Sequence, residues 1–228
     1  MHEPLRAVLF DLDGTLLDSQ RQEVLIMTRL FCTDLGLKLD EQEIASYRGV
    51  PSREVLEQLA SRPAGLAPDR VEELLSTWLS YHEATVNQAP LFPGVVEILH
   101  TLSQARLALG VVTGQSRAEL DASRRHVALD NLIDVWIAAD DTSFAKPHPA
   151  PVRLALEAIG CRPDQAAMIG DSRFDMEAGR RAGTRLGAAL WGARDPGLLL
   201  DFQPDYVFEH PWQMQNLLCG TKEKGDAQ

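Results

Sequence analysis

The 228-residue sequence has few cysteines and no long apolar run. Its three cysteines, Cys32, Cys161 and Cys219, are far apart and form no CxxC pair, which argues against a disulfide framework or a zinc site. No stretch approaches the ~20 apolar residues of a membrane span, and the N-terminus lacks the charged and long apolar regions of a signal peptide. We therefore expect a cytoplasmic protein with no membrane partner.

Basic residues are also fewer than acidic residues. The sequence has 22 lysines and arginines against 33 aspartates and glutamates, which gives a formal charge of −11. An acidic protein of this kind lacks the electrostatic footprint of non-specific nucleic-acid binding. If the substrate is anionic, a local site must attract it, because the overall field of the protein does not.

Three common site motifs are missing as well. The sequence contains no GxxxxGK[ST], no GxGxxG and no GxSxG. A P-loop, a dinucleotide-binding turn and a serine-hydrolase elbow therefore have no support.

Short apolar runs alternate with segments of helical periodicity along most of the chain. This alternation predicts an α/β fold with a parallel sheet covered by helices on both faces. The expected strands are residues 7–10, 107–112, 135–139, 166–170, 186–191 and 206–208. The expected helices outside the insert described next are residues 95–104, 116–126, 150–159 and 175–182.

Residues 18–89 differ from the rest because they show helical spacing and no good strand signal. Val24, Met27, Leu30 and Phe31 recur at intervals of three and four residues. Residues 61–70 contain two prolines and a glycine, so we predict a loop there and a helix over 71–86. We predict a core built from residues 1–17 and 90–228, with residues 18–89 inserted as a helical domain.

Asp11 and Asp13 directly follow the first predicted strand, where an open α/β sheet places its ligands. One reading is an acidic turn, because Asp-Gly is a common turn pair. Another is a division of labour in which one aspartate attacks phosphorus and the other transfers protons. A calcium loop is a weaker reading, since the DxDxDG spacing is missing.

Three further motifs also stand at or after strand ends. Thr113 and Gly114 offer a hydroxyl and backbone N–H groups for phosphate oxygens, or they form an ordinary turn. Lys146, beside the prolines of AKPHP, is a solvated lysine or a fixed charge that neutralises a phosphoryl group. Asp171 or Ser172 caps the helix that follows, or Asp171 and Asp175 join Asp11 in a Mg²⁺ site.

Together, in this order, the segments FDLDGTLLDS, VVTGQS, AKPHP and IGDSRFDMEAGRRAG resemble the four motifs of the haloacid dehalogenase superfamily of phosphohydrolases. The resemblance extends from about Arg6 to Gly192 and implies a Rossmann-like core. The insert is similar to the four-helix cap of the first cap class. Among members, the chain looks most like the phosphoglycolate phosphatase and pyrophosphatase branch.

The resemblance also implies a role for each motif residue. Asp11 would be the nucleophile that forms an aspartyl-phosphate, Asp13 the acid–base, and Lys146 the group that orients Asp11 and offsets its charge. Dehalogenases lack the second aspartate, so Asp13 favours phosphate chemistry.

Other family residues would hold the phosphoryl group and the metal. Thr113 and the Gly114 amide would bind phosphoryl oxygens. Mg²⁺ would be held by Asp171, by Asp11, by the backbone carbonyl of Asp13, and by Asp175 directly or through water. Four carboxylates would repel a dianionic phosphate without Mg²⁺ and Lys146.

The insert is expected to supply specificity as a mobile lid. Gly49, between Arg48 and Arg53, resembles a cap loop that reaches the active site in relatives. Arg48 or Arg53 would then bind a second anionic group of the substrate, unless both are solvated helix positions.

The expected reaction is hydrolysis of a small phosphorylated metabolite by a monomer or homodimer. Inorganic pyrophosphatase and a phosphomutase of the β-phosphoglucomutase type are the alternatives on the same scaffold. A non-enzymatic regulator is a remote one, because every motif residue is present.

Overall fold

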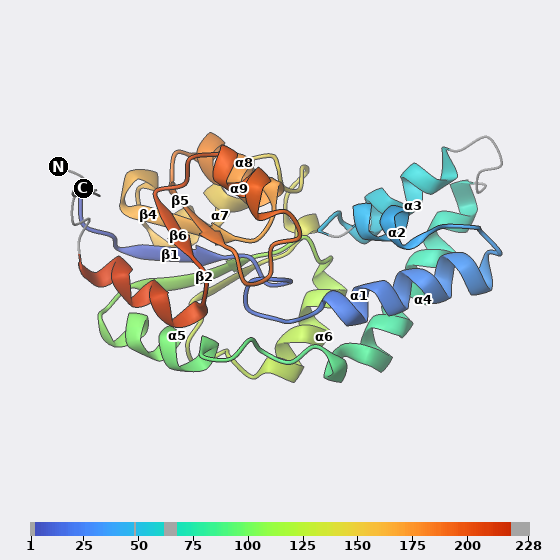
Figure 1. Ribbon diagram of the computed structural model, residues 1–228, viewed down its shortest axis with the longest axis horizontal. Coiled ribbons are helices and arrows are strands. Elements are labelled where there is room, and N and C mark those ends of the chain that lie inside the picture. Colours follow the sequence, from blue (N-terminus) through green and yellow to red (C-terminus); the bar gives the residue numbers. More distant parts are fainter. Residues whose placement is uncertain (1–2, 48, 62–67, 220–228) are drawn as a thin grey trace.

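The computed structural model describes residues 3–47, 49–61 and 68–219 and contains a six-stranded parallel sheet (Figure 1). The strand order is β3-β2-β1-β4-β5-β6. The strands are β1 (Ala7–Phe10), β2 (Ala108–Val112), β3 (Val135–Ile137), β4 (Ala166–Gly170), β5 (Arg185–Ala189) and β6 (Tyr206–Phe208). The predicted α/β class with a Rossmann-like parallel sheet is confirmed.

Helices cover both faces of this sheet, which is why the strands are continuous apolar runs. On one face α7 (Ala150–Ile159) packs against β2 and β3, and α8 (Arg173–Ala182) packs against β4 and β5. On the opposite face lie α5 (Val95–Gln104) and the 3₁₀ segment Pro211–Cys219, which pack together (Figure 1). Strands β1 and β4 are fully buried, so the carboxyl ends of the central strands stand on a rigid base.

The described part of the insert contains helices joined by short irregular segments, and no strand. Its elements are α1 (Gln20–Met27), a π-helical continuation (Thr28–Asp34), α2 (Glu41–Ser46), α3 (Ser52–Ala60), α4 (Pro68–Thr85) and a 3₁₀ turn (Val86–Gln88). Helices α1 to α4 lie beyond one end of the sheet (Figure 1). They bury a separate apolar cluster, in which the Phe31 ring contacts Tyr47 and Trp78 with centroids 6.4 and 6.0 Å apart. The predicted division at residues 17/18 and 89/90 falls where Leu17 bridges Leu91.

The predicted strands end within two residues of the observed ones. Helix α4 begins at Pro68, inside the predicted loop, because proline is well suited to the first turn of a helix. Helix α8 begins at Arg173, two residues early, because Ser172 is its N-cap. Helices α6 (Arg117–Val127) and α9 (Pro196–Asp201) complete the core, and α9 was not predicted because its six residues are too few to show periodicity. No helix in the described ranges is both long and apolar enough to cross a bilayer.

Candidate active site

The carboxyl ends of the central strands bring Lys146 between two aspartates. Its Nζ donates hydrogen bonds to Asp11 Oδ1 at 2.7 Å, to Asp175 Oδ1 at 2.6 Å and to the backbone carbonyl of Val112 at 2.7 Å. The side chains of Lys146, Asp11 and Asp175 are 5%, 9% and 0% exposed. Three acceptors use all three protons of the ammonium group, so Lys146 is held in one position.

Burial and neighbouring charge shift the pKa values of this cluster. Burial lowers the pKa of Lys146, but the carboxylates of Asp11 and Asp175 raise it by more, so Lys146 stays charged. Burial, and then the charge of Asp175, raise the pKa of Asp11 to about 8, although Lys146 acts in the opposite direction. The single positive charge of Lys146 therefore does not neutralise the negative charge of the carboxylates around it.

Asp175 is both a helix cap and a partner of Lys146. The Ser172 backbone N–H and hydroxyl donate to Asp175 Oδ2 at 3.0 and 2.5 Å, which forms the capping box of α8. Gly170 makes room for it, because a Cβ at that position would lie 2.3 Å from the Asp175 Cβ. Both Asp175 oxygens thus have donors, and Ser172, one of the two N-cap candidates, is the N-cap of α8.

Asp171 completes an acidic cluster, and its side chain packs against a position that only glycine can fill. One carboxylate oxygen each from Asp11, Asp171 and Asp175 lie within 4.8 Å of one another. Gly14 has φ +79°, and a Cβ there would lie 2.2 Å from Asp171 Oδ2, so only glycine fits beside this carboxylate. Thr15 Oγ1 donates to Asp171 Oδ1 at 3.2 Å. A set of carboxylate oxygens fits a hard cation such as Mg²⁺.

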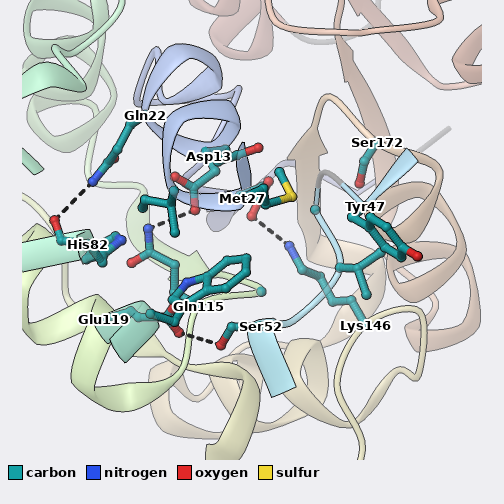
Figure 2. A pocket seen from close by; sticks show the side chains of 17 residues that line it. Asp13, Gln22, Met27, Tyr47, Ser52, His82, Gln115, Glu119, Lys146 and Ser172 are labelled. Atoms are coloured by element: carbon teal, nitrogen blue, oxygen red, sulfur yellow. Dashed lines mark hydrogen bonds and ion pairs between the residues drawn. The ribbon is translucent and has the colours of Figure 1, made fainter. Parts of the chain in front are cut away.

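Asp13 has a partner that sequence reasoning missed. Gln115 Nε2 donates to Asp13 Oδ2 at 2.8 Å (Figure 2). The Gln115 backbone N–H donates to Thr113 Oγ1 at 3.1 Å, so the threonine hydroxyl shapes the turn that presents the glutamine. Gly114 lines the same cavity as Asp13. The only signal in the sequence was a polar residue two positions after Thr113.

The insert closes over these residues. A cavity of about 60 Å³ contains Asp11, Asp13 and Lys146 together with Met27, Tyr47 and Trp78 from the insert (Figure 2).

Hydrogen bonds hold this closure. Ser52 Oγ donates to Glu119 Oε2 at 3.1 Å, and His82 Nε2 lies 3.1 Å from Ser123 Oγ. Gly49 also reaches the site, since its carbonyl oxygen lies 3.2 Å from where a Cβ on Gly114 would stand.

Of the two arginines predicted to bind substrate, Arg53 is described, and it pairs with an acidic residue of the insert. Arg48 lies outside the described residues. Arg53 donates twice to Glu72, at 2.7 and 3.2 Å, and its side chain is 53% exposed. Instead, Arg173 and Arg194 line an open cavity of about 410 Å³ that also contains Asp11, Asp13 and Asp171.

The raised pKa of Asp11 predicts a stability effect. The folded chain keeps a proton on Asp11 between about pH 4 and pH 8 that the unfolded chain has lost, so stability falls as pH rises through this window. In chelator at pH 8, Asp11→Asn should therefore melt at a higher temperature than the wild type, whereas Asp201→Asn, at an exposed position, should not. Thermal unfolding at several pH values measures this, and a lower melting temperature for Asp11→Asn would contradict it.

Comparison with known proteins identifies the family to which the sequence belongs. The family model described as haloacid dehalogenase-like hydrolase matches residues 8–189. A pyrophosphatase PpaX from Bacillus velezensis is 31% identical over 221 residues, covering 96% of this chain and 97% of the relative. Another, from Oceanobacillus iheyensis, is 28% identical over 206 residues, covering 90% of this chain and 92% of the relative.

A crystal structure from Lactobacillus plantarum, provisionally assigned as a phosphoglycolate phosphatase, has a TM-score of 0.82 and 28% identity. It is matched over 94% of this chain and all of that one. The family match spans the four motifs that supply Asp11, Thr113, Lys146 and Asp171. The chain belongs to the haloacid dehalogenase-like hydrolases.

Proposed function

We propose that the protein is a magnesium-dependent phosphatase that hydrolyses a small phosphate monoester through an aspartyl-phosphate on Asp11. The observation that carries this proposal is the fixed Lys146 bridge. It orients one Asp11 oxygen and leaves Asp11 in a cavity shared with Asp13. Attack on phosphorus needs positioning and charge neutralisation more than covalent activation, and both are supplied here.

In the proposed first step Asp11 reacts in its ionised form: its free carboxylate oxygen attacks phosphorus, and the bond between phosphorus and the leaving oxygen breaks. Asp13 gives its proton to that oxygen as it departs. In the second step Asp13 takes a proton from water, the water oxygen attacks phosphorus, and the bond to Asp11 breaks. Inorganic phosphate leaves, and both aspartates return to their starting states.

Several residues would support these steps. The Gly114 amide and the Thr113 hydroxyl would hold phosphoryl oxygens, and the hydroxyl also accepts a hydrogen bond from the Gln115 backbone N–H. Asp11, Asp171 and the Asp13 carbonyl would hold Mg²⁺, and Asp175 would act mainly through Lys146 and Ser172. When bound, Mg²⁺ neutralises charge on the carboxylates and the transferring group.

The proposed setting is the cytoplasm, with a small phosphorylated metabolite as partner and a monomer or homodimer as the working form. Residues 18–89 would serve as the lid that excludes water and reads the leaving group.

Magnesium binding predicts a thermal shift that depends on Asp171. Because Mg²⁺ binds only the folded site, it should raise the melting temperature of the wild type as its concentration exceeds Kd. Asp171→Asn should weaken this shift, and the surface variant Asp164→Asn should keep it. Equal shifts in the wild type and Asp171→Asn would remove Asp171 from the site.

Inorganic pyrophosphatase activity is the second candidate function, and two arginines beside Asp11 favour it. The two relatives compared above carry that name, and Arg173 and Arg194 line the open cavity next to Asp11. Within the described chain, neither guanidinium forms an ion pair with an acidic side chain. Each is therefore available to a second anionic group, which a pyrophosphate provides and a simple ester does not.

This arginine pair predicts a substrate-dependent loss. Arg173→Ala or Arg194→Ala should raise KM for pyrophosphate about tenfold, the scale of one lost charge-assisted hydrogen bond, and leave KM for phenyl phosphate nearly unchanged. Arg162→Ala, which removes an exposed arginine paired with Asp164, is the matched control. Unchanged KM for pyrophosphate in both variants would exclude these arginines from substrate binding.

The experiment that tests the function is phosphate release from a panel of monoesters and pyrophosphate with Mg²⁺, using Asp11→Asn as control. The proposal expects release that the variant abolishes, with the preferred compound identifying the leaving group. Transfer of phosphate between sugar positions without release would favour the mutase. Binding of a phosphorylated compound with no turnover would favour the regulator.

A further inference from the structure

Gln115 is a buried amide in the catalytic cavity, where an apolar side chain would avoid the cost of burying polar atoms. Only 8% of the residue is exposed. Its Nε2 donates to Asp13 Oδ2 at 2.8 Å across 102 residues of sequence. Its Oε1 is buried and has no hydrogen-bond partner within the described part of the chain. A buried acceptor without a partner reduces stability, so the position is not optimised for stability alone.

The backbone around Gln115 fixes the direction of this amide. Its N–H donates to Thr113 Oγ1 at 3.1 Å, and its carbonyl accepts from the Ala139 N–H at 2.8 Å. The next residue, Ser116, is the N-cap of α6 and forms a capping box with Glu119. The side chain therefore extends from a turn anchored at β2, at the segment after β3 and at the start of α6.

The arrangement also determines which amide atom faces Asp13. A carboxylate only accepts hydrogen bonds, so the amide must present its NH₂ group and leave its oxygen on the other side. In Figure 2 the dashed line joins the Gln115 nitrogen to Asp13 inside the cavity. The hydrogen bond restricts rotation of the Asp13 carboxylate, whose other oxygen remains available.

We propose that Gln115 is a positioning residue for proton transfer, holding the Asp13 carboxyl in the orientation that protonates the leaving oxygen. This inference rests on the proposed phosphatase function. No bond forms or breaks at Gln115, because the proton passes from Asp13 to the oxygen released from phosphorus. The prediction is that loss of the amide affects substrates in proportion to their need for that proton.

The test compares two esters of similar shape. The leaving group of 4-nitrophenyl phosphate departs without a proton, whereas that of phenyl phosphate needs one. The ratio kcat/KM reports steps up to cleavage of the ester, so the later role of Asp13 toward water does not enter. Gln115→Met should lower kcat/KM about tenfold or more for phenyl phosphate and much less for 4-nitrophenyl phosphate, and Asp13→Asn should show the same pattern.

Two further measurements separate positioning from structural support. Adding Gln115→Met to Asp13→Asn should cause no further loss, because the two residues act as a unit. The melting temperature of Gln115→Met should stay the same or rise, because the variant removes an unpaired buried oxygen. Gln22→Met is the matched control. Gln22 is 2% exposed and donates to the His82 carbonyl and Thr85 Oγ1, so its loss should lower the melting temperature without changing the ratio between the esters.

Equal losses for both esters in Gln115→Met, or a further loss in the Asp13→Asn background, would overturn the inference while the wild-type activity stands. A wild type that releases phosphate from neither ester would instead overturn the proposed function and this inference with it. Preserved activity toward 4-nitrophenyl phosphate would also show that Gln115→Met is folded.

Discussion

The site depends on one ammonium group held between two buried carboxylates. Lys146 contacts Asp11 and Asp175 at 2.7 and 2.6 Å, and all three side chains are almost fully buried. Removing Lys146 would leave the buried carboxylates without a counter-charge, which is more costly than the pairing itself is stabilising. This triad links the ends of β1 and β2 to the first turn of α8, and it therefore sets the spacing of the whole site.

The same crowding explains why small residues surround the cluster. Gly14 and Gly170 stand where a Cβ would collide with Asp171 and Asp175. The carboxylates are thus packed against backbone, where electrostatic interactions are stronger than in bulk water. The insert covers another side of the site by placing Gly49 against Gly114 and Ser52 against Glu119. The proposed function accounts for this repulsion, because closely spaced carboxylates attract a divalent cation, and the cation would in turn neutralise a phosphoryl group.

Much of this arrangement could be predicted from local sequence. Short apolar runs such as residues 7–10 are diagnostic of buried parallel strands, and aspartates directly after them must lie at the ligand-binding edge of the sheet. Lys146 was harder, since a lysine in a loop is normally solvated, and only its order among the other motifs indicated its role.

The rest depended on contacts between distant segments. Gln115 meets Asp13 across 102 residues, and Arg173 and Arg194 share a cavity although they belong to different helix–loop segments. Arg53 was predicted as a possible substrate ligand or a solvated helix residue. Nothing in the sequence indicated that its guanidinium would instead form an ion pair with Glu72. Side-chain pairing of this kind has no signature in a single sequence.

The central claim is that Asp11 carries the phosphoryl group. Its most direct test is acid quenching of the enzyme during turnover with Mg²⁺ and the preferred substrate, followed by mass spectrometry of the peptide that contains Asp11. The account predicts one added phosphoryl group on Asp11, lost on base treatment and absent in Asp11→Asn. Turnover with no phosphorylated Asp11, and with water attacking the substrate directly, would contradict it.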